Sequence, residues 1–137
     1  MTTKVNVDNF AIGPRYRSLM WDVKRRHPIS FLKNRCEWYI YPKRRAIPDF
    51  PLHVDFESSA ACNLECPMCW RVKPGYDETL YGNMKFDLYK KGLDECAEHG
   101  LYSIRLSWRG ECTVNPRIVD MIAYAKERGI KEVKLHV

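Results

Sequence analysis

The chain has 137 residues, enough for one ordinary domain, and its 45% content of apolar residues suits a folded core rather than a disordered tail. No apolar run approaches the ~20 residues that cross a bilayer, and the start of the chain lacks the hydrophobic stretch of a signal peptide. Composition therefore argues against a membrane protein or a secreted disulfide scaffold, and we expect a cytoplasmic protein whose thiols are reduced.

The net charge of +6 is unevenly distributed. Residues 1–50 hold eleven Lys and Arg against four Asp and Glu, a net charge of +7, whereas residues 51–137 hold twelve against thirteen, a net charge of −1. We interpret residues 1–50 as a basic N-terminal extension that docks its aromatic side chains on the domain that follows. Basic clusters among aromatic residues also occur in nucleic-acid-binding proteins. No nucleic-acid motif accompanies this one, so nucleic acid is not the expected partner.

From Leu52 onward the hydrophobic pattern predicts alternating strands and helices. Leu52, Val54 and Phe56 alternate with polar residues, as in a strand with one apolar face. Asn115 followed by Pro116 marks a helix start, because Asn is a favoured N-cap and Pro suits the first helical position. In chain order the predicted elements are a strand at 52–56, a helix at 86–99, a strand at 102–108, a helix at 115–128 and a strand from 132. This βαβαβ order predicts an α/β fold with a parallel sheet.

Three cysteines stand directly after the first predicted strand, in the run Cys62-Asn63-Leu64-Glu65-Cys66-Pro67-Met68-Cys69. Iron–sulfur clusters are held by thiolates, and a four-iron cluster normally takes one thiolate for each iron. Three closely spaced cysteines therefore leave one iron open to a ligand that is not protein. This C-x3-C-x2-C spacing predicts a 4Fe–4S cluster on Cys62, Cys66 and Cys69.

A structural zinc site is the alternative for this loop. Such a site takes four tetrahedral ligands, commonly as two closely spaced pairs. The other cysteines, Cys36, Cys96 and Cys112, are scattered singly along the chain. We expect Cys96 and Cys112 to be packing residues. The alternative function is therefore a non-catalytic module in which the cysteine loop binds zinc or a cluster and the basic segment binds nucleic acid.

The cysteine loop resembles the hallmark of the radical S-adenosylmethionine (radical SAM) enzymes. A second motif supports the resemblance: Ser107-Trp108-Arg109-Gly110-Glu111 is similar to the family's Gly-Gly-Glu element at the end of the second strand, with Arg109 in place of the first glycine. The resemblance covers roughly Phe50 to Val137. The segment 41–51 is similar to the approach segment of members that modify peptides.

The resemblance implies roles for individual residues. Cys62, Cys66 and Cys69 would bind three irons, and the amino and carboxylate groups of S-adenosyl-L-methionine would chelate the fourth. Glu111 would accept hydrogen bonds from the methionyl ammonium, a charge-assisted contact, and Gly110 would let the backbone approach the ligand. Met68, where the family usually has an aromatic residue, would contact the adenine through its adaptable side chain. No catalytic residue is implied.

The resemblance also implies a fold, the partial (βα)6 TIM-like barrel of this family. Residues 51–137 would form the N-terminal part of that barrel domain. The chain stops within its third predicted strand, so we expect a truncated domain. The polar side chains of the alternating strands would line the inside of the barrel or lie at strand ends in water; they are Asp55, Glu57, Arg105, Lys134 and His136.

The function implied is that of a radical SAM enzyme. It would reductively cleave S-adenosylmethionine to a 5'-deoxyadenosyl radical, which abstracts a hydrogen atom from a substrate. The expected partners are a reductant such as a flavodoxin or ferredoxin and an unidentified substrate, for which a peptide is the first candidate. No membrane partner is expected.

Overall fold

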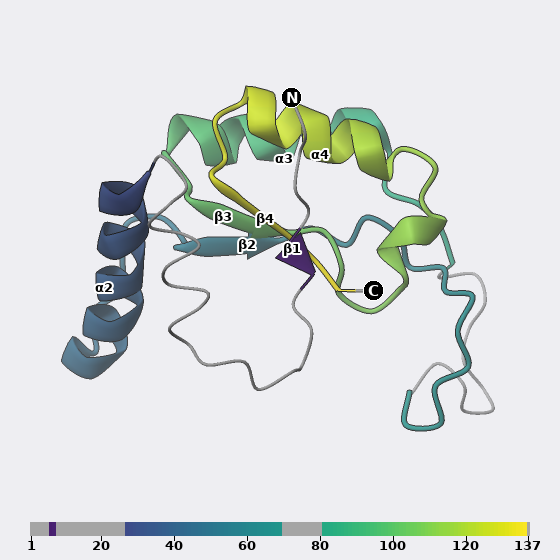
Figure 1. Cartoon of the computed structure of the whole chain (residues 1–137), viewed down its shortest axis with the longest axis horizontal. Coiled ribbons are helices and arrows are strands. Elements are labelled where there is room, and N and C mark those ends of the chain that lie inside the picture. The colour runs from purple at the N-terminus through teal and green to yellow at the C-terminus, as the bar shows by residue number, and fades with distance from the viewer. Residues whose placement is uncertain (1–5, 8–26, 70–80, 137) are drawn as a thin grey trace.

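The computed structural model describes residues 6–7, 27–69 and 81–136, and these residues form an α/β fold. Three helices, one short 3-10 helix and four strands are present among them (Figure 1). In chain order the elements are β1 (Asn6–Val7), α2 (Pro28–Arg44), β2 (His53–Asp55), α3 (Phe86–Glu98), β3 (Ser103–Arg105), η3 (Cys112–Val114), α4 (Ile118–Glu127) and β4 (Glu132–Leu135).

The sheet has the strand order β1-β4-β3-β2, and every pairing is parallel. In the central pairs Val54 lies opposite Ile104, and Ile104 lies opposite Val133. The segment from β2 to β4 is therefore the βαβαβ unit that the hydrophobic pattern predicts. The pairing of Asn6–Val7 with β4 was not predicted, because two residues carry no detectable period.

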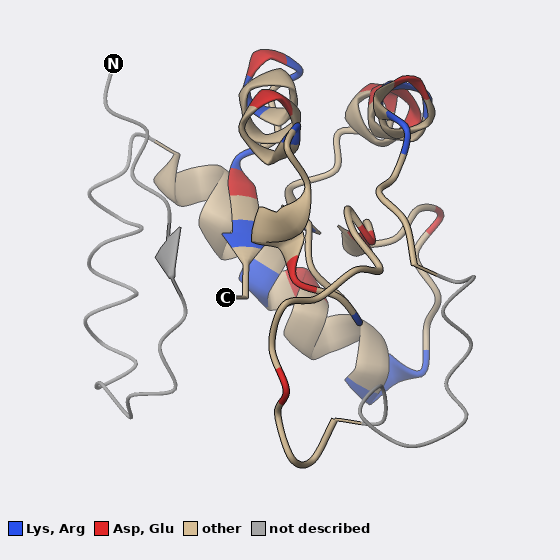
Figure 2. Ribbon diagram, turned by 90° about the vertical axis from the view of Figure 1, so that its right-hand side faces the viewer, with Lys and Arg blue, Asp and Glu red and all other residues tan. Residues whose placement is uncertain are grey.

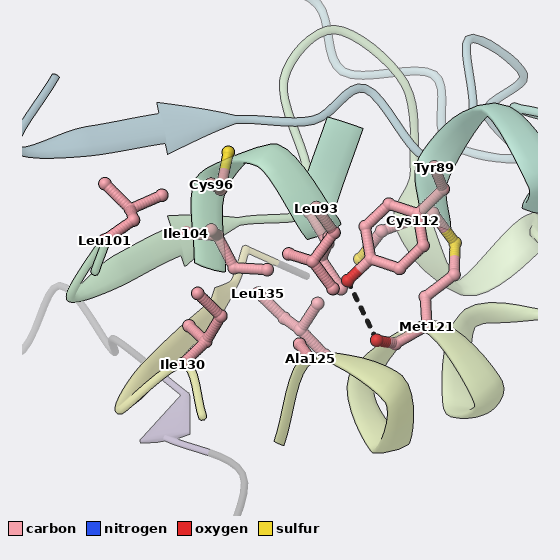
Figure 3. Close-up of a cluster of buried hydrophobic side chains, with 11 residues drawn as sticks. Tyr89, Leu93, Cys96, Leu101, Ile104, Cys112, Met121, Ala125, Ile130 and Leu135 are labelled. Atoms are coloured by element: carbon pink, nitrogen blue, oxygen red, sulfur yellow. Dashed lines mark hydrogen bonds between the residues drawn. The ribbon is translucent and has the colours of Figure 1, made fainter. Parts of the chain in front are cut away.

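The hydrophobic core lies between the sheet and the helices α3 and α4, which cover the same face of the sheet (Figure 1). Figure 3 shows side chains from α3, α4 and the strands meeting there, with the Tyr89 hydroxyl donating to the Met121 carbonyl at 2.8 Å. Leu93, Ile104 and Leu106 are fully buried. Burying one such side chain contributes about 1.5–3 kcal/mol, so this interface holds the unit together.

Several element boundaries differ from the sequence-based expectations. The second strand is shorter, Ser103–Arg105, and the second helix begins at Ile118 rather than at Pro116. The cause is local: the Asn115 side chain accepts the Arg117 amide at 2.8 Å and closes a turn before the helix. The expected helix ends are confirmed, because Gly100 and Gly129 have φ of 68° and 88°, a conformation that glycine adopts without strain.

Helix α2 was not predicted, since residues 1–50 were interpreted only as a basic extension. Its buried side chains are Phe31 and Asn34 alone, so the sequence has no apolar stripe of helical period. Polar contacts fix it to the amino ends of the strands: Arg35 donates to both oxygens of Glu132, at 3.0 and 3.2 Å. The ring of Trp38 lies 6.4 Å from that of His53. Helix α2 therefore stands beside the edge where β2 begins (Figure 1).

The sheet face away from α3 and α4 carries charged side chains that pair across strands and along β4. Strand side chains alternate between the two faces, so Asp55, Arg105 and Lys134 share the face opposite Ile104. Figure 2 shows acidic and basic segments together on the strands. Arg105 Nε donates to Asp55 Oδ1 at 2.8 Å, and Lys134 Nζ lies 3.7 Å from Glu132. The expected polar face exists, and its charges neutralise one another.

No helix in the described part of the chain is long and apolar enough to cross a membrane.

Candidate functional site

The cysteine loop leaves the carboxyl end of β2 and forms the teal loop at the lower right of Figure 1. Its backbone turns tightly, because the Cys69 amide donates to the Cys66 carbonyl at 2.9 Å. The Cys62 sulfur accepts the Leu64 amide at 3.4 Å, and amide donors of this kind tune thiolates that bind iron. All three cysteines are free thiols; Cys66 is exposed and the other two are half-buried. None of these three sulfur donors belongs to the hydrophobic core.

The three thiols are not gathered around a common point. Among residues 6–7, 27–69 and 81–136, no three His, Cys, Asp or Glu side chains form a group that could hold a metal ion. The loop also has no fourth cysteine: Cys96 and Cys112 are buried in the core, and Cys36 lies on α2. The donor set therefore suits a cluster with three protein ligands better than a four-ligand zinc site. The assignment of Cys62, Cys66 and Cys69 as ligands stays a prediction.

The base of the cysteine loop is held by backbone hydrogen bonds to the chain segment just before α3. The Ala60 amide donates to the Gly82 carbonyl at 2.8 Å, and the Met84 amide donates to the Ser58 carbonyl at 2.9 Å. Ser59 and Asn83 form an antiparallel bridge between these bonds. The two ends of the excursion from residue 61 to residue 81 therefore lie side by side.

Two buried polar residues tie this base to the rest of the fold. Asn115 is 1% exposed, and its side-chain amide donates to the Ser58 carbonyl at 2.6 Å. Ser58 in turn donates from its hydroxyl to the Leu106 carbonyl at 2.5 Å. The start of the cysteine loop is thus fixed to both β3 and the start of α4. Sequence analysis missed these residues; Asn115 had a signal, but only as a helix cap.

Glu111 lies in the second loop at the same edge of the sheet, after β3. The residue is 7% exposed, and its Oε1 accepts hydrogen bonds from the Thr113 amide at 2.9 Å and the Thr113 hydroxyl at 2.7 Å. No hydrogen bond from another described residue reaches Oε2. The Glu111 amide donates to the Ala61 carbonyl at 2.8 Å, next to Cys62. The structure therefore brings Glu111 and the cysteine loop together, while its contact with a cofactor stays a prediction.

The other two predicted cofactor-binding residues differ in their surroundings. Met68 is 92% exposed on the cysteine loop, so it has no role in the core. Gly110 packs against the backbone of residues 59–61, on the side where any other residue would carry its Cβ. The close approach that glycine permits is made here to the protein's own chain. Contacts of Met68 and Gly110 with a cofactor remain predictions.

Two arginines of this edge form ion pairs. Arg109, which replaces the first glycine of the family element, donates to Glu57 from its backbone amide at 3.2 Å and from a guanidinium nitrogen at 2.6 Å. Arg105 pairs with Asp55 and also lies over the Trp108 ring, 4.9 Å from its centroid. Trp108 is 61% exposed. The alternation of polar and apolar residues in the sequence indicated a charged sheet face, but it did not indicate which carboxylate each arginine pairs with.

Two further groups have shifted pKa values, one next to Glu111 and one at the start of β2. Burial, followed by the neighbouring Glu111 carboxylate, raises the pKa of the Cys112 thiol to about 11, so this cysteine is protonated and unreactive at neutral pH. Burial lowers the pKa of His53, and the attraction of Asp55 only partly offsets it. His53 lies between the Ser103 hydroxyl, at 2.6 Å, and Asp55, at 3.0 Å. Because Ser103 is 1% exposed, we assign the hydrogen-bonded set of His53, Ser103 and Asp55 a structural role.

Comparison with known proteins adds a likeness of fold and a likeness of sequence. No protein-family model matches the chain. The structure superposes on that of BtrN in complex with AdoMet and 2-DOIA with a TM-score of 0.58, over 65% of this chain and 36% of BtrN, at 15% sequence identity. At this sequence identity the likeness shows a common fold, and it does not bear on activity.

The sequence likeness is to part of a longer protein. A stretch of 78 residues is 38% identical to the tungsten-containing aldehyde ferredoxin oxidoreductase cofactor-modifying protein of Pyrococcus furiosus, and it covers 56% of this chain and 21% of that protein. A shorter stretch of 57 residues is 28% identical to a β-galactosidase of Psychromonas ingrahamii and covers 5% of it. The chain thus spans about a fifth, or less, of the curated relatives it matches.

Proposed function

We propose that this chain carries the N-terminal part of the core domain of a radical SAM enzyme. The observation that carries the proposal is the junction of two loops at the carboxyl edge of a parallel sheet: the cysteine loop and the loop of Glu111 are joined by the hydrogen bond from Glu111 to Ala61. Ligands of α/β proteins bind at this edge of the sheet. The fold likeness to a protein solved with AdoMet supports the same reading.

In this proposal Cys62, Cys66 and Cys69 hold a 4Fe–4S cluster, and S-adenosylmethionine binds at its open iron. The bound cluster supplies the electron that cleaves the cofactor and so starts radical chemistry on a substrate. The protein holds the thiols on one short loop. The Leu64 amide donates to the Cys62 sulfur, and hydrogen bonds to cluster sulfurs help to set the reduction potential of such clusters.

Glu111 binds and orients the cofactor in this proposal. Its Oε1 is occupied by Thr113, which fixes the rotamer of the carboxylate and leaves Oε2 to accept from the methionyl ammonium. Met68, exposed one residue before Cys69, packs against the adenine and excludes water from it.

The finer fold and the partners belong to the same proposal. Residues 51–137 are the first part of a (βα)6 barrel whose inner face is the charged side of the sheet, and residues 1–50 form the extension that precedes it. The reductant is a small redox protein such as a flavodoxin or ferredoxin. The substrate is a peptide or, given the cofactor-modifying relative, another protein's cofactor.

Metal analysis after anaerobic reconstitution tests this proposal. The chain is incubated with iron, sulfide and zinc in competition, and the bound metals and sulfide are then quantified. We expect about four irons and four sulfides per chain, because a three-thiolate loop suits a cluster with one open iron. Bound zinc with neither iron nor sulfide would contradict the proposal and favour the zinc module that binds nucleic acid.

A further inference from the structure

The backbone around Gly110 lies unusually close to the backbone that leads into the cysteine loop. A Cβ built on Gly110 would be 2.1 Å from the Ser59 carbonyl oxygen and 2.6 Å from the Ala61 carbonyl oxygen. Non-bonded heavy atoms make their best contact at about 3.5–4.0 Å. Both obstacles are backbone atoms, which cannot rotate away as a side chain can. Among the natural amino acids only glycine fits here.

This close approach fixes the position of Glu111 relative to Cys62. The 2.8 Å hydrogen bond from the Glu111 amide to the Ala61 carbonyl joins Glu111 itself to the residue just before Cys62. Ser59 holds the acceptor side in place, because its hydroxyl oxygen accepts the Ala61 amide at 3.1 Å. Ser59 and the donor residue Glu111 are buried, and Ala61 is half-buried.

We propose that Gly110 is a positioning residue: it acts through the Ala61–Glu111 hydrogen bond and sets the distance between the Glu111 carboxylate and the thiols of the cysteine loop. The proposal rests on the proposed function, because it assigns those two groups to a cofactor and to a cluster. It differs from a direct contact of Gly110 with the cofactor. The glycine is required by the protein's own backbone, whether or not a ligand is bound.

The substitution Gly110→Ala should separate cluster binding by the cysteine loop from cofactor binding by Glu111. The added methyl group pushes residues 110–111 away from 59–61 and breaks the Glu111–Ala61 hydrogen bond. The three thiols stay within one stretch of eight residues, and the base of their loop keeps its hydrogen bonds to Gly82 and from Met84. We therefore expect iron loading to persist and the affinity for S-adenosylmethionine to fall by at least about tenfold, the effect of losing one oriented charge-assisted contact.

Gly82→Ala is the matched control. Gly82 lies at the base of the same loop and accepts the Ala60 amide, but a Cβ at this position would meet no atom within 4 Å. Its φ is not positive, so alanine adopts the same backbone. This variant should load iron and bind S-adenosylmethionine as the unmodified chain does.

The experiment compares the unmodified chain, Gly110→Ala, Gly82→Ala and Ser59→Ala. Iron and sulfide content are measured after reconstitution, S-adenosylmethionine affinity by calorimetry, and exchange of the Glu111 amide by NMR in the metal-free protein. Ser59→Ala adds no bulk and removes the hydroxyl that holds the Ala61 amide. It therefore tests the same hydrogen bond if Gly110→Ala fails to fold. It should speed exchange of the Glu111 amide and weaken cofactor binding without loss of iron.

The outcomes separate this inference from the proposed function. If the unmodified chain binds no iron, the proposed function fails. If it binds iron and S-adenosylmethionine, but Gly110→Ala or Ser59→Ala binds the cofactor with unchanged affinity, the positioning role is wrong and the proposed function stands. Rapid exchange of the Glu111 amide in the unmodified, metal-free chain would also overturn the positioning role.

Discussion

Replacing Asn115 with alanine should destabilise the fold at the base of the cysteine loop. The residue is 1% exposed, and its side chain makes three hydrogen bonds. It donates to the Ser58 carbonyl at 2.6 Å and, weakly, to the Met121 sulfur at 3.7 Å, and it accepts from the Arg117 amide at 2.8 Å. A hydrogen bond contributes about 0.5–1.5 kcal/mol net, and a buried group left without a partner costs about 1–3 kcal/mol. The Ser58 carbonyl keeps a second donor, the Met84 amide, at 2.9 Å. The expected loss is therefore about 2 kcal/mol rather than about 4 kcal/mol.

Urea unfolding followed by circular dichroism measures this loss as a shift of the midpoint at constant slope. Asp120→Asn is the control, because it breaks only the exposed ion pair of Asp120 with Arg117 at the start of the same helix, and such pairs contribute about 0–1 kcal/mol. If Asn115→Ala loses no more stability than Asp120→Asn, Asn115 does not connect the cysteine loop to α4.

Three further predictions concern the thiols, the site residues and a buried histidine. In the native metal-free chain, iodoacetamide should alkylate Cys36, Cys62, Cys66 and Cys69 and spare the buried Cys96 and Cys112, whose thiol pKa values are raised; mass spectrometry of modified Cys112 would contradict this. Cys62→Ala, Cys66→Ala and Cys69→Ala should each lose the iron, whereas Glu111→Ala should keep the iron and bind S-adenosylmethionine more weakly in calorimetry; unchanged affinity would remove Glu111 from the site. The pKa of His53 is lowered below its ordinary value of 6.5, so the folded state favours the neutral ring. The stability that His53 contributes is present above pH 6.5 and is lost as the pH falls through the lower folded value. His53→Gln should lose less stability than the unmodified chain between about pH 7.5 and 5 in urea titrations, and equal losses would assign the acid sensitivity to other groups.

The βαβαβ segment could be predicted from the sequence because its patterns are local. Alternation at Ser103–Arg105 and helical spacing at Tyr89, Leu93 and Cys96 each report a buried face within one element. Parallel strands bring their carboxyl ends to one edge, so the meeting of the cysteine loop and Glu111 also follows from the order of elements. Helix α2 could not be predicted, because it is held mainly by polar contacts such as Arg35 with Glu132.

The partners within the site lay beyond sequence reasoning. Glu57 and Arg109 are 52 residues apart in the chain, and nothing in either segment specifies the other. The role of Gly110 illustrates the same limit, since the motif indicated that glycine is needed but not which atoms require it. The obstacle is the backbone of residues 59–61, which only the folded chain brings near.

Electron paramagnetic resonance of the anaerobically reconstituted, dithionite-reduced chain, with and without S-adenosylmethionine, tests the central claim most directly. In the proposed site, the open iron would gain ligands when S-adenosylmethionine binds. We therefore predict the signal of a reduced 4Fe–4S cluster whose line shape changes when S-adenosylmethionine is added. A cluster signal that the cofactor leaves unchanged, or no cluster signal at all, would contradict the assignment of this edge of the sheet as a cofactor site.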